Sequence, residues 1–225
     1  MVNLLDNASI TFDLDGTLVD TAPDLIRVLN ETIDVDGLAP VPVESARNLI
    51  GYGSMALIKK AYENVGTDLP EDRALNLQQT FLDLYADSLS QCSKPYDGVP
   101  EVLVALKRAG ARLSVCTNKP GAMARPLLKQ LELAPFFDRI IGRGDVDACK
   151  PSPQHIFKAV GHRGTSPIIM VGDGAPDIYA AKAAKVPVIL MSYGYSPVSV
   201  HTFGADAVLR NFRDLLPALK DVLKL

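Results

Sequence analysis

The sequence is poor in the features that build disulfide frameworks, zinc sites and membrane spans. It contains three cysteines and three histidines, and no cysteine belongs to a Cys-x-x-Cys pair. This argues against a disulfide framework and a zinc site, and predicts reduced thiols. No apolar run approaches the roughly 20 residues that cross a bilayer, and residues 1–9 lack the basic and apolar segments of a signal peptide. We therefore expect a cytoplasmic protein with no membrane partner.

Basic residues are also in the minority. Lys and Arg total 23 against 26 Asp and Glu, so the formal net charge is −3, and no long basic run is present. Nucleic-acid binders usually carry the opposite balance, so we expect no nucleic-acid partner. Apolar residues make up 48% of the 225 residues, which is enough for a core domain with a smaller insertion. The sequence favours no particular oligomeric state.

The pattern of apolar residues changes along the chain. Ile10–Phe12 is a short β-rich run, and the stretch after it has apolar residues only at helical spacing. After Pro95, strand and helix patterns alternate, which predicts parallel βαβ units with helices on both faces of one sheet. The first strand must join that sheet. Residues 1–18 and 93–225 are therefore predicted to form an α/β, Rossmann-like core, and residues 19–92 an inserted α-helical cap.

The expected elements can be bounded from the same patterns. Thr21 with Asp24 predicts a capping box at the first helix of the insertion. The expected strands are Ile10–Phe12, Leu113–Cys116, Arg139–Ile141, Ile168–Val171, Val188–Met191 and Ala207–Leu209. The expected helices of the core are Val99–Ala109, Ala122–Leu131, Pro153–Val160, Pro176–Lys185 and Phe212–Leu223.

Acidic, hydroxyl and ammonium groups follow different strands of the expected sheet. In chain order they are Asp13 and Asp15, Thr117, Lys150, and Asp173 and Asp177. Ligands of an open parallel sheet bind outside the carboxyl ends of its strands, so we expect these groups to converge at one edge. Asp13, Asp173 and the backbone carbonyl of Asp15 would make a hard-oxygen site that suits Mg²⁺.

Four segments of the chain carry these groups. They are Asp13-Leu-Asp-Gly-Thr-Leu-Val-Asp20, Thr117-Asn118, Lys150-Pro151 and Gly172-Asp173-Gly-Ala-Pro-Asp177. They resemble the four motifs of the haloacid-dehalogenase superfamily, and the resemblance covers essentially the whole chain. Within the superfamily the chain is similar to the phosphoglycolate phosphatase group, on segments that include Tyr193-Gly-Tyr195. It departs from that group at Gly174, where a serine is usual, and at Lys185, where a glycine is common.

The resemblance implies a catalytic role for four of these residues. Asp13 would attack phosphorus and form an aspartyl-phosphate intermediate. Asp15 would protonate the leaving group and then deprotonate the attacking water, which requires an upward shift of its pKa. Lys150 and Mg²⁺ would neutralise the phosphoryl oxygens, and Thr117 would donate a hydrogen bond to them.

The resemblance also implies residues that bind the metal and the substrate. The metal would be held by Asp13, Asp15 and Asp173, with Asp177 holding a metal-bound water or orienting Lys150. Phosphate and substrate would contact Gly16, Thr17, Asn118, Arg47, Gly51, Tyr52 and Gly53. Lys119 fits a substrate contact or a surface charge equally, and His155 fits a structural or surface role.

Three functions remain open at this point. The resemblance favours a Mg²⁺-dependent phosphatase of a small phosphorylated metabolite, such as phosphoglycolate. A phosphosugar mutase similar to β-phosphoglucomutase would use the same core residues but return the phosphoryl group to a sugar. A non-catalytic binding protein on this fold is disfavoured because all the catalytic positions are filled.

Overall fold

The structure, a computed structural model, describes residues 5–6, 8–161 and 166–224. The chain divides into two compact units, Met1–Asp20 with Pro95–Leu225, and Thr21–Lys94. These boundaries lie two residues beyond those expected from the sequence. A separate two-stranded sheet of β2 (Val19–Asp20) and β3 (Lys94–Pro95) lies at the two points where the chain passes from one unit to the other.

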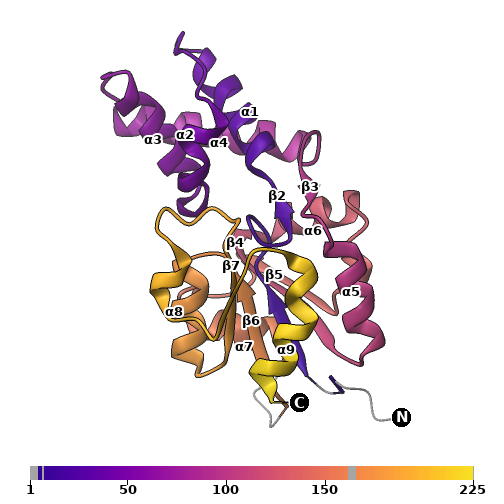
Figure 1. Ribbon diagram of the computed structural model, residues 1–225. Helices are drawn as coiled ribbons and strands as arrows, with labels where there is room; N and C mark the ends of the chain where they lie inside the picture. The colour runs from indigo at the N-terminus through magenta and orange to yellow at the C-terminus, as the bar shows by residue number, and fades with distance from the viewer. Residues whose placement is uncertain (1–4, 7, 162–165, 225) are drawn as a thin grey trace. The chain divides into compact units, whose positions relative to one another are not determined.

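The larger unit is built on a six-stranded sheet in the order β5-β4-β1-β6-β7-β8, with all neighbouring strands parallel (Figure 1). Its strands are β1 (Ser9–Phe12), β4 (Arg112–Pro120), β5 (Arg139–Arg143), β6 (Ile168–Gly172), β7 (Val188–Met191) and β8 (Ala207–Leu209). This confirms the predicted α/β fold. In the centre, Phe12 is aligned with Val115 of β4 and with Val171 of β6. The segments that follow β1, β4 and β6 therefore leave the sheet side by side.

The central strands are apolar because helices cover both faces of the sheet. On one face, Ile156 of α7 (Pro153–Val160) and Ile178 of α8 (Ala175–Ala184) join a buried cluster with Met170 of β6. On the other face, the ring centroid of Phe12 lies 6.2 Å from that of Phe137 and 6.0 Å from that of Phe212. The helices of this unit are α5 (Val99–Arg108), α6 (Gly121–Gln130), α7 (Pro153–Val160), α8 (Ala175–Ala184) and α9 (Leu215–Leu223), with short 3-10 helices η2 (Ala134–Phe136), η3 (Val200–Phe203) and η4 (Phe212–Asp214).

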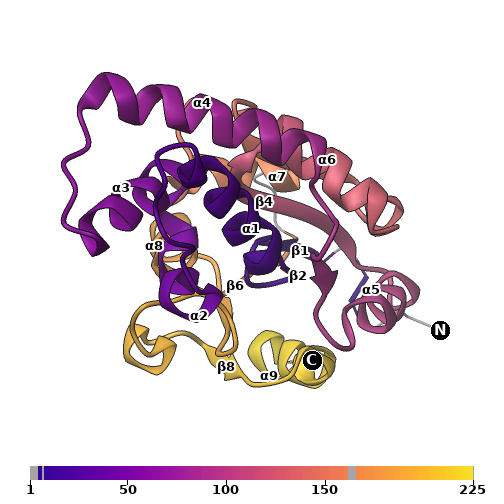
Figure 2. The same cartoon turned by 90° about the horizontal axis from the view of Figure 1, so that it is seen from above.

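The smaller unit is helical. It contains α1 (Ala22–Asp34), α2 (Val43–Ala46), the 3-10 helix η1 (Arg47–Tyr52), α3 (Ser54–Asn64) and α4 (Glu71–Asp87). Helices α1, α3 and α4 pack against one another, and Figure 2 shows α4 running along the other two. The buried residues on these helices include Leu29, Leu57 and Phe81.

The predicted capping box at the start of α1 is wrong. Thr21 precedes the helix, but its side chain makes no capping hydrogen bond. The Asp24 carboxylate instead accepts hydrogen bonds from Cys92 N (2.9 Å), Ser93 N (2.7 Å) and Ser93 Oγ (2.7 Å). Asp24 is fully buried against these non-helical residues, whose N–H groups need an acceptor. The carboxylate therefore joins the first turn of α1 to the segment that precedes β3.

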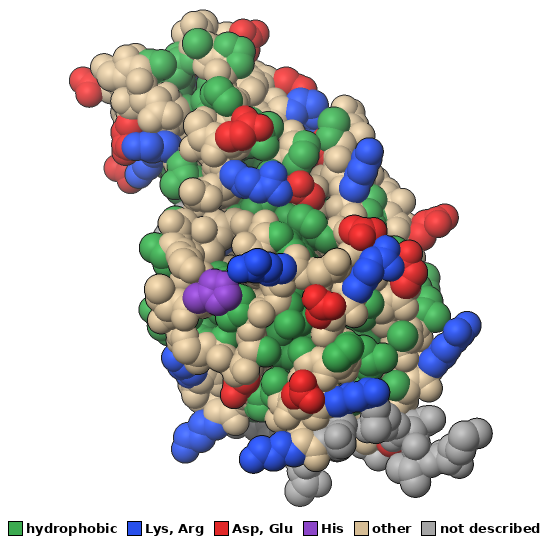
Figure 3. Space-filling model, viewed as in Figure 1, with side chains coloured by type: hydrophobic (Ala, Val, Ile, Leu, Met, Phe, Trp, Pro, Cys, Tyr) green, Lys and Arg blue, Asp and Glu red, His purple; other side chains and the backbone are tan. Residues whose placement is uncertain are grey.

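The surface carries charges of both signs. Figure 3 shows acidic and basic side chains mixed over one face of the molecule. None of the described helices combines the length and the apolar character that a membrane span requires.

Candidate active site

Asp13 lies directly beyond the end of the central strand. Its N–H group donates to Val171 O (2.8 Å), which extends the pairing of β1 with β6 by one residue. Its Oδ1 atom accepts a hydrogen bond from Leu14 N (2.8 Å) and lies 2.9 Å from Lys150 Nζ. The backbone thus places this carboxylate at the edge of the sheet, where its side chain is 16% exposed.

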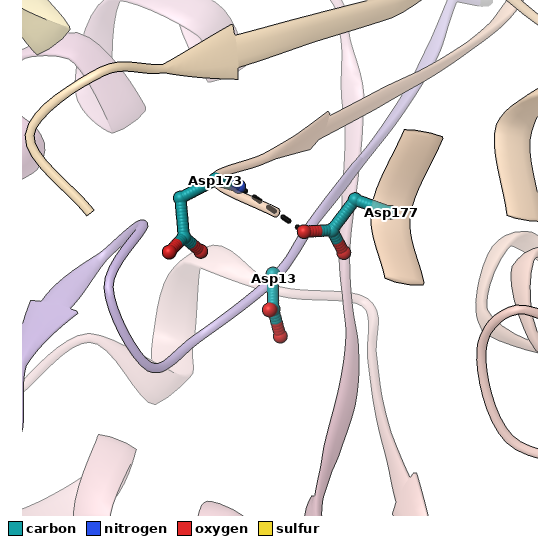
Figure 4. Close-up of side chains that lie close together, drawn as sticks. All are labelled: Asp13, Asp173 and Asp177. Atoms are coloured by element: carbon teal, nitrogen blue, oxygen red, sulfur yellow. Dashed lines mark hydrogen bonds between the residues drawn. The ribbon is translucent and has the colours of Figure 1, made fainter. Parts of the chain in front are cut away.

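Three carboxylates meet at this edge. Asp13, Asp173 and Asp177 each offer one oxygen atom, and these atoms lie within 4.8 Å of one another (Figure 4). Burial raises the pKa of Asp13 to about 6; Lys150 lowers it, and the charge of Asp177 raises it further. Burial, together with the charges of Asp177 and Asp13, also holds the pKa of Asp173 well above its usual range. A cation bound among these oxygens would offset their mutual repulsion, so the donor set fits a metal ion.

Hydrogen bonds and close packing hold Asp173 in place. Its Oδ1 accepts a hydrogen bond from Thr17 Oγ1 (2.8 Å), and its Oδ2 accepts one from Tyr195 N (2.7 Å). A Cβ atom at Gly16 would lie 2.5 Å from Asp173 Oδ2, and one at Gly194 would lie 2.3 Å from it. Gly16 also has a positive φ of 84°. Thr17 and Gly16, expected at the phosphate, therefore position an acidic side chain of the cluster.

Lys150 is held at both its ammonium and its backbone. Its buried Nζ lies 2.9 Å from Asp13 Oδ1 and 2.7 Å from Asp177 Oδ1. Burial alone would lower the pKa of Lys150, but these two carboxylates raise it above its usual range. The Lys150 N–H donates to His155 Nδ1 (3.1 Å), and the Lys150 carbonyl accepts from Asn118 Nδ2 (3.0 Å). The Asn118 side chain, expected at the phosphate, thus binds the backbone of Lys150.

Asp177 connects the lysine to the loop before α8. Its Oδ1 contacts Lys150, and its Oδ2 accepts hydrogen bonds from Asp173 N and Gly174 N, both at 3.1 Å. The Asp173 N–H bond is the dashed line in Figure 4. One carboxylate therefore fixes the first turn of α8, the backbone of Asp173 and the ammonium of Lys150 together.

Asp15 has a different partner from the other aspartates. Its Oδ1 lies 3.0 Å from Lys119 Nζ and its Oδ2 lies 3.4 Å from the same atom. Among the described residues, the acidic cluster does not include the Asp15 carboxylate. Thr117, 1% exposed and located within β4, accepts a hydrogen bond from Lys119 N at its Oγ1 (3.1 Å).

The remaining predicted substrate residues belong to the helical unit. Arg47 is half-buried at the start of η1, and Gly51 is exposed near its end. Gly53 has a positive φ of 89°, and a Cβ atom there would meet nothing within 4 Å, so its backbone conformation is the reason for a glycine. The side chain of Tyr52 lies outside the described part of the structure.

Two contacts among these residues were not identified from the sequence. The pairing of Lys119 with Asp15 joins residues 104 positions apart. The contact of His155 with Lys150 spans only five positions, and the signal was a lone histidine in a helix rich in apolar residues. A buried polar residue of that kind needs hydrogen-bond partners, which a reading of periodicity does not supply.

Residues 10–191 match the model of the haloacid dehalogenase-like hydrolase family. The chain belongs to that family. It is 42% identical over 213 residues to a phosphoglycolate phosphatase of Caulobacter vibrioides, which covers 94% of this chain and 90% of that protein. It is 32% identical to an N-acetylmuramic acid 6-phosphate phosphatase of Pseudomonas aeruginosa over 96% of each chain.

Solved structures agree with this family assignment. A crystal structure of a predicted phosphoglycolate phosphatase from Haemophilus somnus superposes with a TM-score of 0.86 and 31% identity, over 93% of this chain and 96% of that one. The predicted resemblance to the haloacid-dehalogenase superfamily and its phosphoglycolate phosphatase group is thereby confirmed. The protein is a phosphatase of the haloacid dehalogenase-like family.

Proposed function

We propose that the protein hydrolyses a phosphate monoester of a small metabolite with Mg²⁺ as its cofactor, through a phosphoryl group carried on Asp13. The observation that carries the proposal is the position of the Asp13 carboxylate. It lies at the end of the central strand, against the ammonium of Lys150 and within 4.8 Å of two further carboxylates. The proposed nucleophile, a fixed ammonium and two further carboxylates thus lie close together.

In the first step, a carboxylate oxygen of Asp13 attacks phosphorus and the bond from phosphorus to the bridging ester oxygen breaks. The leaving oxygen takes a proton from Asp15, so the products are an alcohol and an acyl phosphate on Asp13. Lys150 stabilises the negative charge on the phosphoryl oxygens, because its ammonium is held in place before the substrate arrives. Thr117, in the irregular part of the neighbouring strand β4, is the hydroxyl donor to the same oxygens.

In the second step, water attacks the phosphorus of the acyl phosphate and loses a proton to Asp15. The bond from phosphorus to Asp13 breaks, inorganic phosphate leaves, and both aspartates return to their starting states. The Asp15 carboxylate contacts Lys119 and, within the described part of the chain, is not part of the acidic cluster, so it is separate from the carboxylates proposed to bind the metal.

Asp13 and Asp173 are proposed as direct ligands of Mg²⁺, with the backbone carbonyl of Asp15 as a third. Mg²⁺ is the ion of choice because the donors are all oxygen and few are needed when water and phosphate complete the coordination. When bound, it supplies positive charge to the phosphoryl oxygens. Asp177 already accepts two N–H groups and an ammonium, so we assign it to orienting Lys150.

Phosphoglycolate is the proposed substrate, supported by the likeness to phosphoglycolate phosphatases. We further propose that the helical unit acts as a cap, with Arg47, Gly51, Tyr52 and Gly53 contacting the substrate. The three free cysteines support a reducing, cytoplasmic compartment.

A phosphate-release assay with Mg²⁺ tests the proposal, using phosphoglycolate, sugar phosphates, nucleotides and pyrophosphate. We expect release from phosphoglycolate to be fastest, and to be lost in Asp13→Asn, whose amide is a poor nucleophile. Asp221→Asn, at an exposed position of α9, is the matched control and should behave like the native protein. Intact-mass measurement during turnover should find a phosphorylated form that Asp13→Asn lacks.

The outcomes separate the chemistry from the substrate. A sugar-biased profile would keep the chemistry and discard phosphoglycolate, and a requirement for a sugar bisphosphate would favour the mutase. Full activity of Asp13→Asn, or turnover that survives complete metal removal, would contradict the mechanism.

A further inference from the structure

One buried cation at the edge of the sheet, Lys119, contacts Asp15 but is assigned no contact with the substrate in the mechanism above. The Lys119 side chain is 4% exposed, although lysine is usually among the most exposed residues. Removing an ammonium from water is unfavourable unless charged or polar partners compensate for the lost hydration. A buried lysine next to the proposed acid and base therefore requires a functional explanation.

An irregularity near the end of β4 directs the Lys119 side chain toward Asp15. The register of β4 against β5 is irregular between Cys116 and Pro120, the stretch that carries Thr117 and Lys119. Irregularities of this kind redirect side chains next to active sites. The N–H of Lys119 donates to Thr117 Oγ1, and its Nζ lies 3.0 Å from Asp15 Oδ1. Lys119 thus contacts both Thr117, the proposed hydrogen-bond donor to the phosphate, and Asp15, the proposed proton donor.

We propose that Lys119 selects substrates whose leaving group carries a carboxylate on the carbon bonded to the bridging oxygen. The inference rests on the proposed function, which places Asp15 at that oxygen. In such a substrate, one carbon atom separates the carboxylate from the bridging oxygen. If that oxygen contacts Asp15, the carboxylate lies within reach of the Lys119 ammonium, which contacts Asp15 as well. Phosphoglycolate has this chemistry, as do other 2-phosphooxy carboxylates.

Lys150 provides a precedent within the same site for one ammonium that binds two carboxylates. Its Nζ lies 2.9 Å from Asp13 and 2.7 Å from Asp177 at the same time. An ammonium has three N–H donors with flexible directions, so it can bridge two anions. Lys119 would bridge Asp15 and the substrate carboxylate in the same way. Its ion pair with Asp15 holds it ready without excluding the second anion.

The test compares two esters that differ only in this group. Phosphoglycolate ends in a carboxylate, and 2-hydroxyethyl phosphate has an uncharged CH₂OH in its place. We expect the native enzyme to prefer phosphoglycolate in kcat/KM by at least about tenfold, and Lys119→Met to reduce that preference by about 10- to 100-fold, mainly through KM. A slower proton transfer by Asp15 would affect both esters and so cancel in the ratio, whereas Lys119→Arg, which keeps a positive charge next to Asp15, separates the contact made by Lys119 from a general change of charge at the site.

Three further variants make the comparison specific. Lys129→Met removes an exposed lysine from α6 and should keep the native preference. Lys119→Arg keeps the positive charge and should retain part of the preference. Lys119→Gln serves as a second uncharged variant where circular dichroism finds Lys119→Met unfolded.

Each result has a distinct meaning. A folded Lys119→Met or Lys119→Gln enzyme with the native preference, or a native enzyme that does not distinguish the two esters, overturns the role of Lys119 and leaves the phosphatase proposal intact. Failure of the native enzyme to hydrolyse either ester or any other phosphomonoester would instead overturn the proposed function itself.

Discussion

At the scale of single residues, His155 is buried and makes two hydrogen bonds, although no motif around it in the sequence indicated such partners. It is fully buried in α7, where Nδ1 accepts the N–H of Lys150 and Nε2 lies 3.2 Å from Ile141 O. The ring must carry its one proton on Nε2 to make both hydrogen bonds, so it is neutral. Burial, together with the charge of Lys150, lowers the pKa of His155 to about 4.

This neutral histidine predicts a loss of stability in acid. The unfolded chain binds a proton at His155 below about pH 6.5, whereas the native protein does so only below about pH 4. Between these values the unfolded state holds more protons, so the free energy of unfolding falls as the pH falls. The full effect is about 3 kcal/mol, at about 1.4 kcal/mol per pKa unit. Urea unfolding at pH 7 and pH 4.5 should therefore give a smaller decrease for His155→Gln than for the native protein.

The raised pKa of Asp13 acts in the opposite direction over part of this range, because there the native state holds the extra proton. It is common to the native protein and to His155→Gln, so the difference between them isolates the histidine. His201→Gln, at an exposed position, should follow the native curve. Parallel curves for the native protein and His155→Gln would mean that His155 is charged or exposed in the native state.

At the scale of elements, the end of α8 carries local strain. Lys185 follows the helix with φ 56° and ψ 42°, a left-handed conformation in which the Cβ atom crowds the backbone. The resemblance described in the sequence analysis leads to the expectation of a glycine at this position. A lysine at this position therefore raises the conformational energy of the native backbone relative to a glycine.

We expect Lys185→Gly to raise the free energy of unfolding by up to about 1 kcal/mol, since the relief of strain exceeds the entropy that glycine adds to the unfolded chain. Ala183→Gly is the matched control, because it lies in the same helix with an ordinary conformation, and it should lower stability by about 1 kcal/mol. Thermal or urea unfolding measures both. Equal losses in the two variants would show that Lys185 is unstrained in solution.

The elements differ in how far the sequence could predict them. The bounds of β7 and α7 match the predicted ranges, because an apolar run defines the strand and Pro153 with Gly161 brackets the helix. β4 runs to Pro120, four residues past its predicted end, because pairing with β5 resumes after the irregular stretch. The residues in between are polar, so hydrophobicity could not reveal them as strand.

The site was predictable where its chemistry is local to a motif, and less so where it depends on tertiary contacts. The convergence of Asp13, Lys150 and Asp173 follows from the rule that strand ends form ligand sites. The partner of Asp24 lies 69 positions away, at Ser93, and the first-turn pattern around Thr21 predicted a different bond. A buried carboxylate takes the donors that surround it in the fold, and these are invisible in a local window.

At the scale of the whole molecule, the active site concentrates charge that the rest of the fold must accommodate. Four aspartates and two lysines lie together at one sheet edge, and the acidic groups are in excess. Burial of this excess keeps the pKa values of Asp13 and Asp173 high. A divalent cation at the site would therefore stabilise the native state as well as assist the reaction.

The size of that stabilisation should depend on pH. Mg²⁺ binds the ionised carboxylates, so protons compete with it once the pH falls through about 6, where Asp13 takes up a proton in the metal-free protein. We expect millimolar Mg²⁺ to raise the Tm at pH 7.5 by several degrees, EDTA to reverse the rise, and the rise to shrink strongly at pH 5. Asp173→Asn should abolish the rise at both values, whereas Asp221→Asn should keep it. A rise of equal size at pH 7.5 and pH 5, or one that persists in Asp173→Asn, would place the metal at other residues.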